Sequence, residues 1–262
     1  MATDPPLIEF QNVTVRRGSR DVLDGVTLSI AQGENVAILG PNGSGKSTLV
    51  KAIARDLYPV CKPEPWSLRI LGSDRWDLFD LRNRLGLVSN DWMRMCTRDY
   101  SAFEIVLSGF FGSVGVWPNH AVSAEMRRKA REVLELLEIP HLAERTTEEV
   151  SSGEARRILI ARALVHDPQT LILDEPASSL DLRAARELRE ILRKLAAGGI
   201  GIVMVTHHLP DIIPEMRRVV AIRDGHIHGD GPKERLLTAA TLGGLFGIPV
   251  EVLKRGGYYH VL

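Results

Sequence analysis

The stretch "LGPNGSGKSTL" (residues 39–49) constrains this chain more than any other. It directly follows the apolar run of residues 36–39 and combines three glycines with a lysine and several hydroxyl side chains. Such glycine density weakens a helix or strand interior, so it needs a conformational reason. Gly40, Gly45, Lys46 and Ser47 satisfy the pattern GxxxxGK[ST] between a predicted strand and a predicted helix, which indicates a phosphate-binding loop. A glycine turn with a chance lysine is the alternative. The predicted nucleotide contacts in this loop are Gly40, Pro41, Asn42, Gly43, Ser44, Gly45, Lys46, Ser47 and Thr48.

A second motif supplies the carboxylate that a P-loop needs elsewhere in the chain to hold its metal ion. "TLILDEP" (170–176) is a buried-strand pattern that ends in Asp174 and Glu175, and ligands of open α/β sheets gather at the carboxyl ends of strands. Lys46 can reach the β- and γ-phosphates, and Ser47 and Asp174 are predicted to hold Mg²⁺. Glu175 is placed to orient or deprotonate the attacking water. The alternative is a helix N-cap cluster of acids, the role that the spacing indicates for Asp181.

The alternation of strand and helix patterns predicts the fold class. Residues 7–30 carry two β-rich runs, and from residue 153 helices and strands alternate. We expect an α/β P-loop NTPase core, a mostly parallel sheet flanked by helices, with an N-terminal antiparallel β subdomain and an inserted α-helical subdomain. The predicted organisation is one domain over 1–262. Its core and β subdomain cover about 1–91 and 165–262, and the helical subdomain covers 92–164.

Composition excludes several classes of protein. Lys plus Arg (33) equals Asp plus Glu (33), so no basic field indicates nucleic acid as a partner. Cys61 and Cys96 lie in no CxxC pattern, which argues against a disulfide framework or a standard zinc site. "MATDPPLIEF" lacks the charge and apolar run of a secretory signal. No apolar stretch approaches the roughly 20 residues of a membrane span. We therefore expect any membrane association to come through a partner.

Three further motifs carry a family resemblance. "VSSGEARRILIARALVHDP" (150–168) resembles the LSGGQ signature of ABC-type ATPases, "SSLD" (178–181) resembles their D-loop, and "VTHH" (205–208) resembles their switch-histidine segment. The chain is identified as a member of that family over nearly its whole length. Residues 92–150, especially "YSAFEIVLSGFFGSVG" (100–115), are most similar in character to the helical subdomain of the iron-chelate, cobalamin and molybdate importers.

The resemblance implies a composite nucleotide site. Two subunits, either two copies of this chain or this chain and a paralogous ATPase, would join head to tail with two ATP molecules between them. Each nucleotide would contact the P-loop of one subunit and, on the other, the signature and D-loop residues Ser151, Ser152, Gly153, Glu154 and Asp181. His207 would contact the γ-phosphate and help to hold the attacking water. Taken alone, "SSGE" is a helix N-cap with a nearby acid, and a lone histidine after a strand is often structural.

Three positions depart from the family pattern. Arg17 stands where an aromatic residue usually stacks on adenine; a guanidinium can also stack on a base, and a solvated turn arginine is the alternative. Asn90 replaces the glutamine of the Q-loop, so its metal contact would be direct or through water, unless it is a plain turn residue. In the signature, Ser152 and Glu154 replace a glycine and a glutamine, which could slow turnover or weaken dimerisation.

The predicted function is that of an ATP-hydrolysing subunit. It would couple MgATP-driven dimerisation and hydrolysis to solute transport through a separate integral membrane permease, at the inner face of the cell membrane. A groove for the permease could be formed by Phe103, Phe110, Phe111 and Trp117, although each is individually more typical of a core aromatic. The alternative is a soluble ABC ATPase that remodels a cytosolic complex.

Overall fold

The computed structural model describes residues 5–89 and 100–262. Its centre is a six-stranded sheet in the order β5-β6-β7-β3-β8-β9. The strands are β5 (Gly86–Val88), β6 (Thr170–Asp174), β7 (Gly201–Thr206), β3 (Val36–Leu39), β8 (Arg218–Arg223) and β9 (His226–Pro232). All neighbours pair in parallel except β9, which is an antiparallel edge. Strands β3, β6 and β7 are buried at every position, as expected for a parallel sheet covered on both faces.

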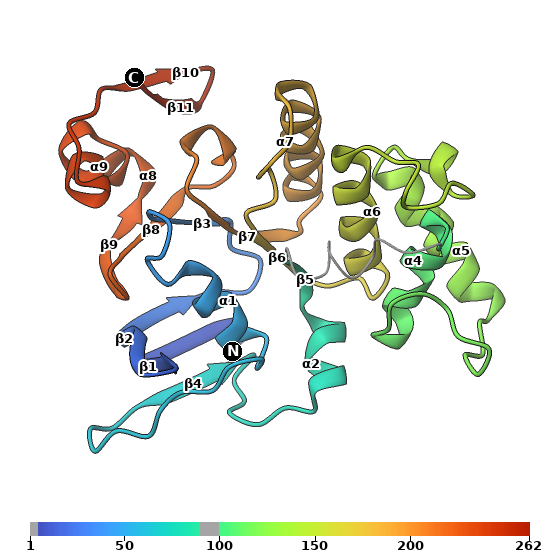
Figure 1. The fold of residues 1–262 in the computed structure, drawn as a ribbon, viewed down its shortest axis with the longest axis horizontal. Coiled ribbons are helices and arrows are strands. Elements are labelled where there is room, and N and C mark those ends of the chain that lie inside the picture. Colours follow the sequence, from blue (N-terminus) through green and yellow to red (C-terminus); the bar gives the residue numbers. More distant parts are fainter. Residues whose placement is uncertain (1–4, 90–99) are drawn as a thin grey trace.

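Two hydrophobic cores lie on the two faces of this sheet. Because successive side chains of a strand point to opposite faces, Val36 and Ile38 enter one core, and Ala37 and Leu39 enter the other. The first core is covered by helix α1 (Lys46–Ile53) and by the N-terminal sheet. The second is covered by α7 (Leu182–Ala197), α9 (Ala239–Phe246) and the helices near residues 100–165. Figure 1 shows these two layers on either side of the sheet.

The N-terminal sheet is antiparallel, in the order β2-β1-β4. Its strands are β1 (Ile8–Arg17), β2 (Arg20–Ile30) and β4 (Ser67–Ile70). Helix α2 (Leu78–Arg84) follows, and Asp77 caps it by accepting hydrogen bonds from the backbone of residues 79 and 80. The predicted fold class, a mostly parallel core with an antiparallel β subdomain, is confirmed.

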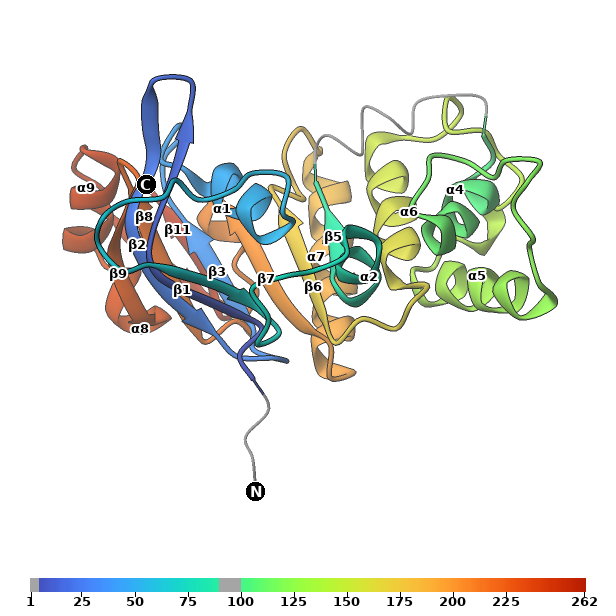
Figure 2. The ribbon, with the colours of Figure 1, turned by 90° about the horizontal axis from the view of Figure 1, so that it is seen from below.

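Helices fill the chain between β5 and β6, which are neighbouring parallel strands. The described elements there are α4 (Ala102–Ser108), η1 (Gly109–Phe111), α5 (Ala124–Leu136), η2 (Pro140–Leu142) and α6 (Ser152–Leu164). Figures 1 and 2 both place this group at one end of the molecule, beyond α7. The chain thus leaves the sheet, forms a helical group and returns to the adjacent strand.

The C-terminal region completes the second face. After β9 come α8 (Lys233–Leu236), α9 and a hairpin of β10 (Val252–Arg255) and β11 (Tyr258–Val261). The short helix η3 (Leu209–Asp211) follows β7. Across residues 5–89 and 100–262, none of the helices has both the length and the apolar character that a membrane crossing requires.

Candidate nucleotide-binding site

The loop between β3 and α1 has a backbone that requires glycine. Gly43 and Gly45 have φ angles of +79° and +107°, in the left-handed region that other residues avoid. A Cβ on Gly45 would lie 2.9 Å from the carbonyl oxygen of Val22, and one on Gly40 would lie 2.2 Å from that of Ile222. Among the described residues, no side chain caps the first turn of α1. The helix therefore begins with backbone N–H groups available to an anion.

Lys46 is held inside this loop. Its side chain is 4% exposed, and its Nζ donates to the carbonyl oxygens of Gly40 and Pro41, each at 2.9 Å. Nζ also lies 3.7 Å from Glu175 Oε1. Burial lowers the pKa of Lys46, and the charges of Glu175 and Asp174 oppose that shift. Phosphate oxygens could replace the two carbonyls as acceptors and add negative charge beside a poorly solvated ammonium.

Ser47 and Asp174 bring two oxygen ligands together. Ser47 Oγ donates to Asp174 Oδ1 at 3.2 Å, and Asp174 is 5% exposed at the carboxyl end of β6. Burial raises the pKa of Asp174, an effect that the Ser47 hydrogen bond partly offsets. A hydroxyl and a carboxylate suit Mg²⁺, which keeps several waters and binds few protein ligands besides the phosphates. The donor set therefore fits the predicted metal.

Glu175 lies at the centre of the site. Its Oε1 is 3.0 Å from His207 Nδ1 as well as 3.7 Å from Lys46 Nζ. Its φ of +50° is unusual for a residue that is not glycine, and its N–H donates to the carbonyl of Val205 on β7 at 2.8 Å. Because β3, β7 and β6 are consecutive in the sheet, their carboxyl ends meet here. We call Lys46, Ser47, Asp174, Glu175 and His207 the P-loop cluster.

The signature segment (151–154) forms the N-terminus of α6, and its first and last residues are hydrogen-bonded to each other. Ser151 is the N-cap residue; its Oγ accepts from the N–H of Glu154 at 3.3 Å and donates to Glu154 Oε2 at 2.8 Å. The N–H of Ser151 donates to the same oxygen at 2.8 Å, and this bond lowers the pKa of Glu154. Ser151 and Ser152 are exposed, and a Cβ on Gly153 would lie 2.7 Å from the Cβ of Ala184. The N-cap interpretation thus describes the segment as it stands.

The other predicted contacts lie away from the P-loop cluster. Among the residues the structure describes, no hydrogen bond or ion pair joins the signature segment to the P-loop. Asp181 caps α7 by accepting from the N–H of Ala184 at 2.7 Å. Arg17 is exposed at the β1–β2 turn, where its neighbour Arg16 pairs with Asp21 at 2.5 Å. Asn90 lies outside the described residues.

The four candidate groove aromatics occupy different environments. Phe103 and Phe110 are partly buried and pack against the second core. Phe110 also meets the ring of His166 edge-on, while Phe111 stacks on a histidine ring at 4.1 Å. Trp117 is 54% exposed. The core interpretation therefore holds for Phe103 and Phe110, and Trp117 is the one of the four that is mainly at the surface.

Two linked hydrogen bonds next to His207 in the sequence were not predicted. Thr206 Oγ1 donates to Asp211 Oδ2 at 2.9 Å and accepts from the N–H of His208 at 2.9 Å. Because a carboxylate only accepts, the hydroxyl hydrogen of Thr206 points to buried Asp211, and the hydroxyl oxygen accepts from the peptide N–H that follows His207. Arg189 lies 3.8 Å from Asp211. The acid five residues after Thr206 in "THHLPD" was the available signal.

Comparisons with known proteins place this geometry in a family. The family model described as "ABC transporter" matches residues 23–178. The chain belongs to the ABC transporter family. It is 34% identical over 265 residues to the hemin import ATP-binding protein HmuV of Bradyrhizobium diazoefficiens, covering 98% of this chain and 94% of that protein. Because proteins of this family bind and hydrolyse ATP, this protein is an ATPase.

Solved structures agree with this assignment. The structure of CbiO1 from Clostridium perfringens, part of the ABC transporter complex CbiONQ, has a TM-score of 0.76 and 26% identity, with 92% of this chain and 93% of that chain covered. A dimeric post-hydrolysis structure of the ATP-binding cassette MJ0796 with ADP and phosphate has a TM-score of 0.70 and 27% identity, with 86% and 98% covered. ABC cassettes thus share the architecture of this chain.

Proposed function

We propose that this ABC ATPase is the energising subunit of an importer that works through a separate integral membrane permease. It would bind MgATP between two subunits, either two copies of this chain or this chain and a paralogous subunit. The carrying observation is that the P-loop cluster is assembled within one chain, while the exposed Ser151 forms no hydrogen bond or ion pair with that cluster among the described residues. A second subunit would supply the missing part.

The P-loop cluster supports specific roles in hydrolysis. Lys46 would exchange the carbonyls of Gly40 and Pro41 for β- and γ-phosphate oxygens, which are stronger, charged acceptors. Ser47 and Asp174 would hold Mg²⁺, which when bound neutralises charge on the phosphate oxygens. Glu175 would orient the attacking water and take up its proton, and His207, 3.0 Å away, would fix that carboxylate and contact the γ-phosphate.

The remaining predicted contacts belong to the assembled dimer. The exposed Ser151 hydroxyl and the N-terminus of α6 would cover the γ-phosphate bound by the other subunit. Ser152, Gly153, Glu154 and Asp181 would lie at the same interface, and Arg17 would stack on adenine. Asn90 would complete the metal environment. Without nucleotide the start of α1 presents backbone donors that no side chain caps among the described residues, so ATP favours the closed dimer and hydrolysis releases it.

The permease would contact the helical group. We propose the division into a core with β subdomain (about 1–91 and 165–262) and a helical subdomain (92–164), whose surface includes Trp117. Relatives support the import role: HmuV is named as a hemin import protein, and CbiO1 as part of a transporter complex. In this proposal the protein is peripheral on the inner face of the cell membrane, held there by the permease.

Affinity purification of the tagged protein from native membranes tests this proposal. We expect an integral membrane protein to be recovered with it, and the reconstituted complex to take up solute into vesicles only with hydrolysable ATP. The Glu175→Gln variant is the control, since it should be recovered with the same partner but support no uptake. Quantitative recovery with a cytosolic complex, and no membrane partner, would contradict the importer role and favour the remodelling alternative.

A further inference from the structure

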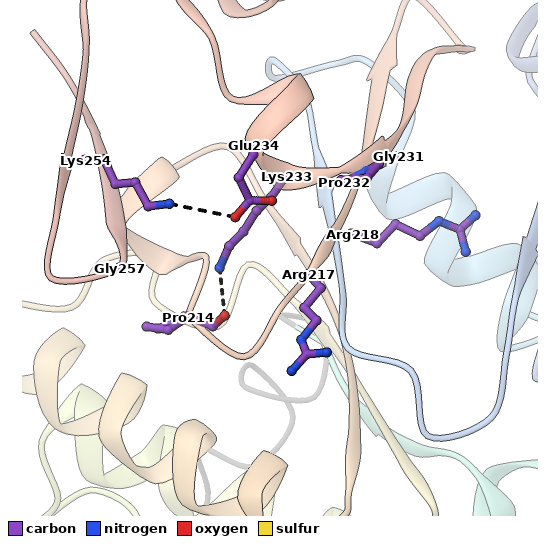
Figure 3. Close-up of a pocket in the computed structure, with 9 residues that line it drawn as sticks. All are labelled: Pro214, Arg217, Arg218, Gly231, Pro232, Lys233, Glu234, Lys254 and Gly257. Atoms are coloured by element: carbon purple, nitrogen blue, oxygen red, sulfur yellow. Dashed lines mark hydrogen bonds and ion pairs between the residues drawn. The ribbon is translucent and has the colours of Figure 1, made fainter.

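A hollow lies at the end of the parallel strands opposite to the P-loop. It has a volume of about 660 Å³ and is bordered by the start of β8, the end of β9, α8, the loop at Pro214 and the β10–β11 hairpin (Figure 3). Arg218, in its wall, pairs in register with Val36, the first residue of β3. The P-loop follows the last residue of β3. The hollow is therefore at the amino ends of the parallel strands and cannot belong to the nucleotide site.

A buried lysine forms part of its lining. Lys233 is 6% exposed, and its Nζ donates to the carbonyl oxygen of Pro214 at 2.7 Å, the contact drawn in Figure 3. An ammonium group has three N–H donors. Within residues 5–89 and 100–262, that carbonyl is its one hydrogen-bond acceptor. Burial lowers the pKa of Lys233, an effect that the charge of Glu234 partly offsets.

The other charges around the hollow leave a positive excess. Arg218 is neutralised by Asp230 at 2.7 Å and by Glu34 at 3.1 Å. Lys254 faces Glu234 at 3.8 Å, as Figure 3 shows. Arg217 is exposed, and its guanidinium has neither a hydrogen bond nor an ion pair among the described residues. Because Arg218 faces two carboxylates, the charged groups around the hollow leave about one net positive charge, and Lys233 and Arg217 are the two cations without an ion pair among the described residues.

A backbone hydrogen bond joins the two residues that carry these cations. The N–H of Lys233 donates to the carbonyl oxygen of Arg217 at 2.9 Å, and the two charged groups are close enough to influence each other. Glu215 is the remaining acid that acts on Lys233, and it is paired with Arg193 at 2.9 Å. An anion bound between Lys233 and Arg217 would give both cations a counter-charge and supply the acceptors that the Lys233 ammonium lacks. A phosphate group carries about −1.5 to −2 at pH 7 and offers three acceptor oxygens.

We propose that this basic hollow binds a phosphate group, either free phosphate or the phosphomonoester of a small molecule, with Lys233 and Arg217 as its ligands. The site is distinct from the ATP site and does not depend on the importer role. Pro214 and Pro232 supply apolar wall on either side of the cations, next to which the carbon part of a phosphomonoester would lie. Lys254 and Glu234 form the rim.

Nuclear magnetic resonance of the full-length protein can test the site directly. Saturating ADP would occupy the P-loop, and inorganic phosphate would be titrated at constant ionic strength and pH 7. The backbone amides of Gly231 and Gly257, which line the hollow, should shift and saturate, while that of Gly43 in the P-loop should stay unchanged. A shift at Gly43 alone, or none that saturates within the millimolar range, would overturn the proposal.

Two variants identify the ligands. Arg217→Ala, an exposed change with little risk to folding, should weaken phosphate binding about tenfold, the loss of one charge-assisted hydrogen bond. Lys233→Met should abolish the saturable shift. Arg235→Ala, on the exposed side of the same helix α8, is the matched control and should bind as the unchanged protein does. Equal binding by all variants would contradict the assignment.

A second probe distinguishes the two sources of phosphate. Glycerol 3-phosphate would be titrated under the same conditions. Tighter binding than inorganic phosphate would assign the hollow to a phosphomonoester, and weaker binding would assign it to the free ion. Either order supports the site if binding of both probes weakens in Arg217→Ala.

Discussion

The helices α1 and α6 both begin at a segment suited to phosphate, but they begin in different ways. Helix α1 follows Gly45, and no side chain among the described residues caps it. Helix α6 follows Ser151, and Glu154 accepts hydrogen bonds from both the N–H and the Oγ of that serine. The first helix therefore has donors ready for an anion, whereas the second has satisfied the donors of its cap from within.

This difference indicates which of the two segments binds nucleotide first. A phosphate can enter the P-loop by displacing neutral carbonyls from Lys46. To bind the signature segment it must compete with the carboxylate of Glu154 for Ser151, and that carboxylate then remains beside it. We therefore infer that nucleotide binds the P-loop of a single chain first, and that Glu154 makes closure of the dimer the harder step.

The largest effect is expected at Lys46. Lys46→Ala removes a buried cation with two charge-assisted hydrogen bonds, so ATP affinity should fall by about 10²-fold or more and hydrolysis should stop. Titration with a fluorescent nucleotide and steady-state ATPase kinetics measure both. Lys194→Ala, on an exposed position of α7, is the matched control. Normal turnover in Lys46→Ala would place the nucleotide somewhere other than the P-loop.

Glu175 should separate binding from chemistry. Glu175→Gln keeps the shape of the side chain but removes the base, so hydrolysis should fall about 10²–10⁴-fold while ATP binding persists. Light scattering should then detect an ATP-dependent dimer that does not dissociate. Glu190→Gln, an exposed change on α7, should behave as the unchanged protein. If Glu175→Gln hydrolyses ATP at the ordinary rate, another group activates the water.

The reciprocal hydrogen bonds between Ser151 and Glu154 at the start of α6 should affect the dissociation constant of the ATP-bound dimer. Glu154→Gln keeps an acceptor for Ser151 but removes the negative charge, so in a Glu175→Gln background the ATP-bound dimer should tighten about two- to fivefold. Ser151→Ala in the same background should weaken it, since the hydroxyl is lost. Analytical ultracentrifugation with ATP measures both. If neither variant changes the dimer, the signature segment does not face the nucleotide.

The smallest effect is one of stability, at Asp174. Burial raises the pKa of this carboxyl, so the folded state binds more protons than the unfolded state and stability falls as pH rises through that range. Asp174→Asn removes the buried charge and should raise the nucleotide-free Tm at pH 7 by about 2–4 °C.

The pH dependence of this gain provides its check. As the pH is lowered through the raised pKa, Asp174 becomes neutral and the difference in Tm between the two proteins should shrink. Thermal unfolding at pH 7 and at progressively lower pH measures it. A variant that is less stable than the unchanged protein at pH 7 would show that the bond from Ser47 outweighs the cost of burying the charge.

Several parts of this protein could be predicted from local sequence. The glycine loop, the strand that ends at Asp174, and the N-caps Ser151 and Asp181 all depend on residues within a few positions of one another. Hydrogen bonds of a cap and the φ angles of a glycine turn are short-range, so spacing alone encodes them. The alternation of strand and helix patterns predicted the fold class, which the structure confirms.

Only the tertiary structure decided which distant residues meet. Ser47 and Asp174 are 127 residues apart in sequence, and they lie within hydrogen-bond reach because β3, β7 and β6 stack side by side in the sheet. The hydrogen bonds that join Thr206 to Asp211 and His208 to Thr206 also depend on that packing, and so does the burial of Lys233. The order of the strands depends on how helices and the second sheet cover both faces of the central sheet. That arrangement involves the whole chain, so no short sequence pattern encodes it.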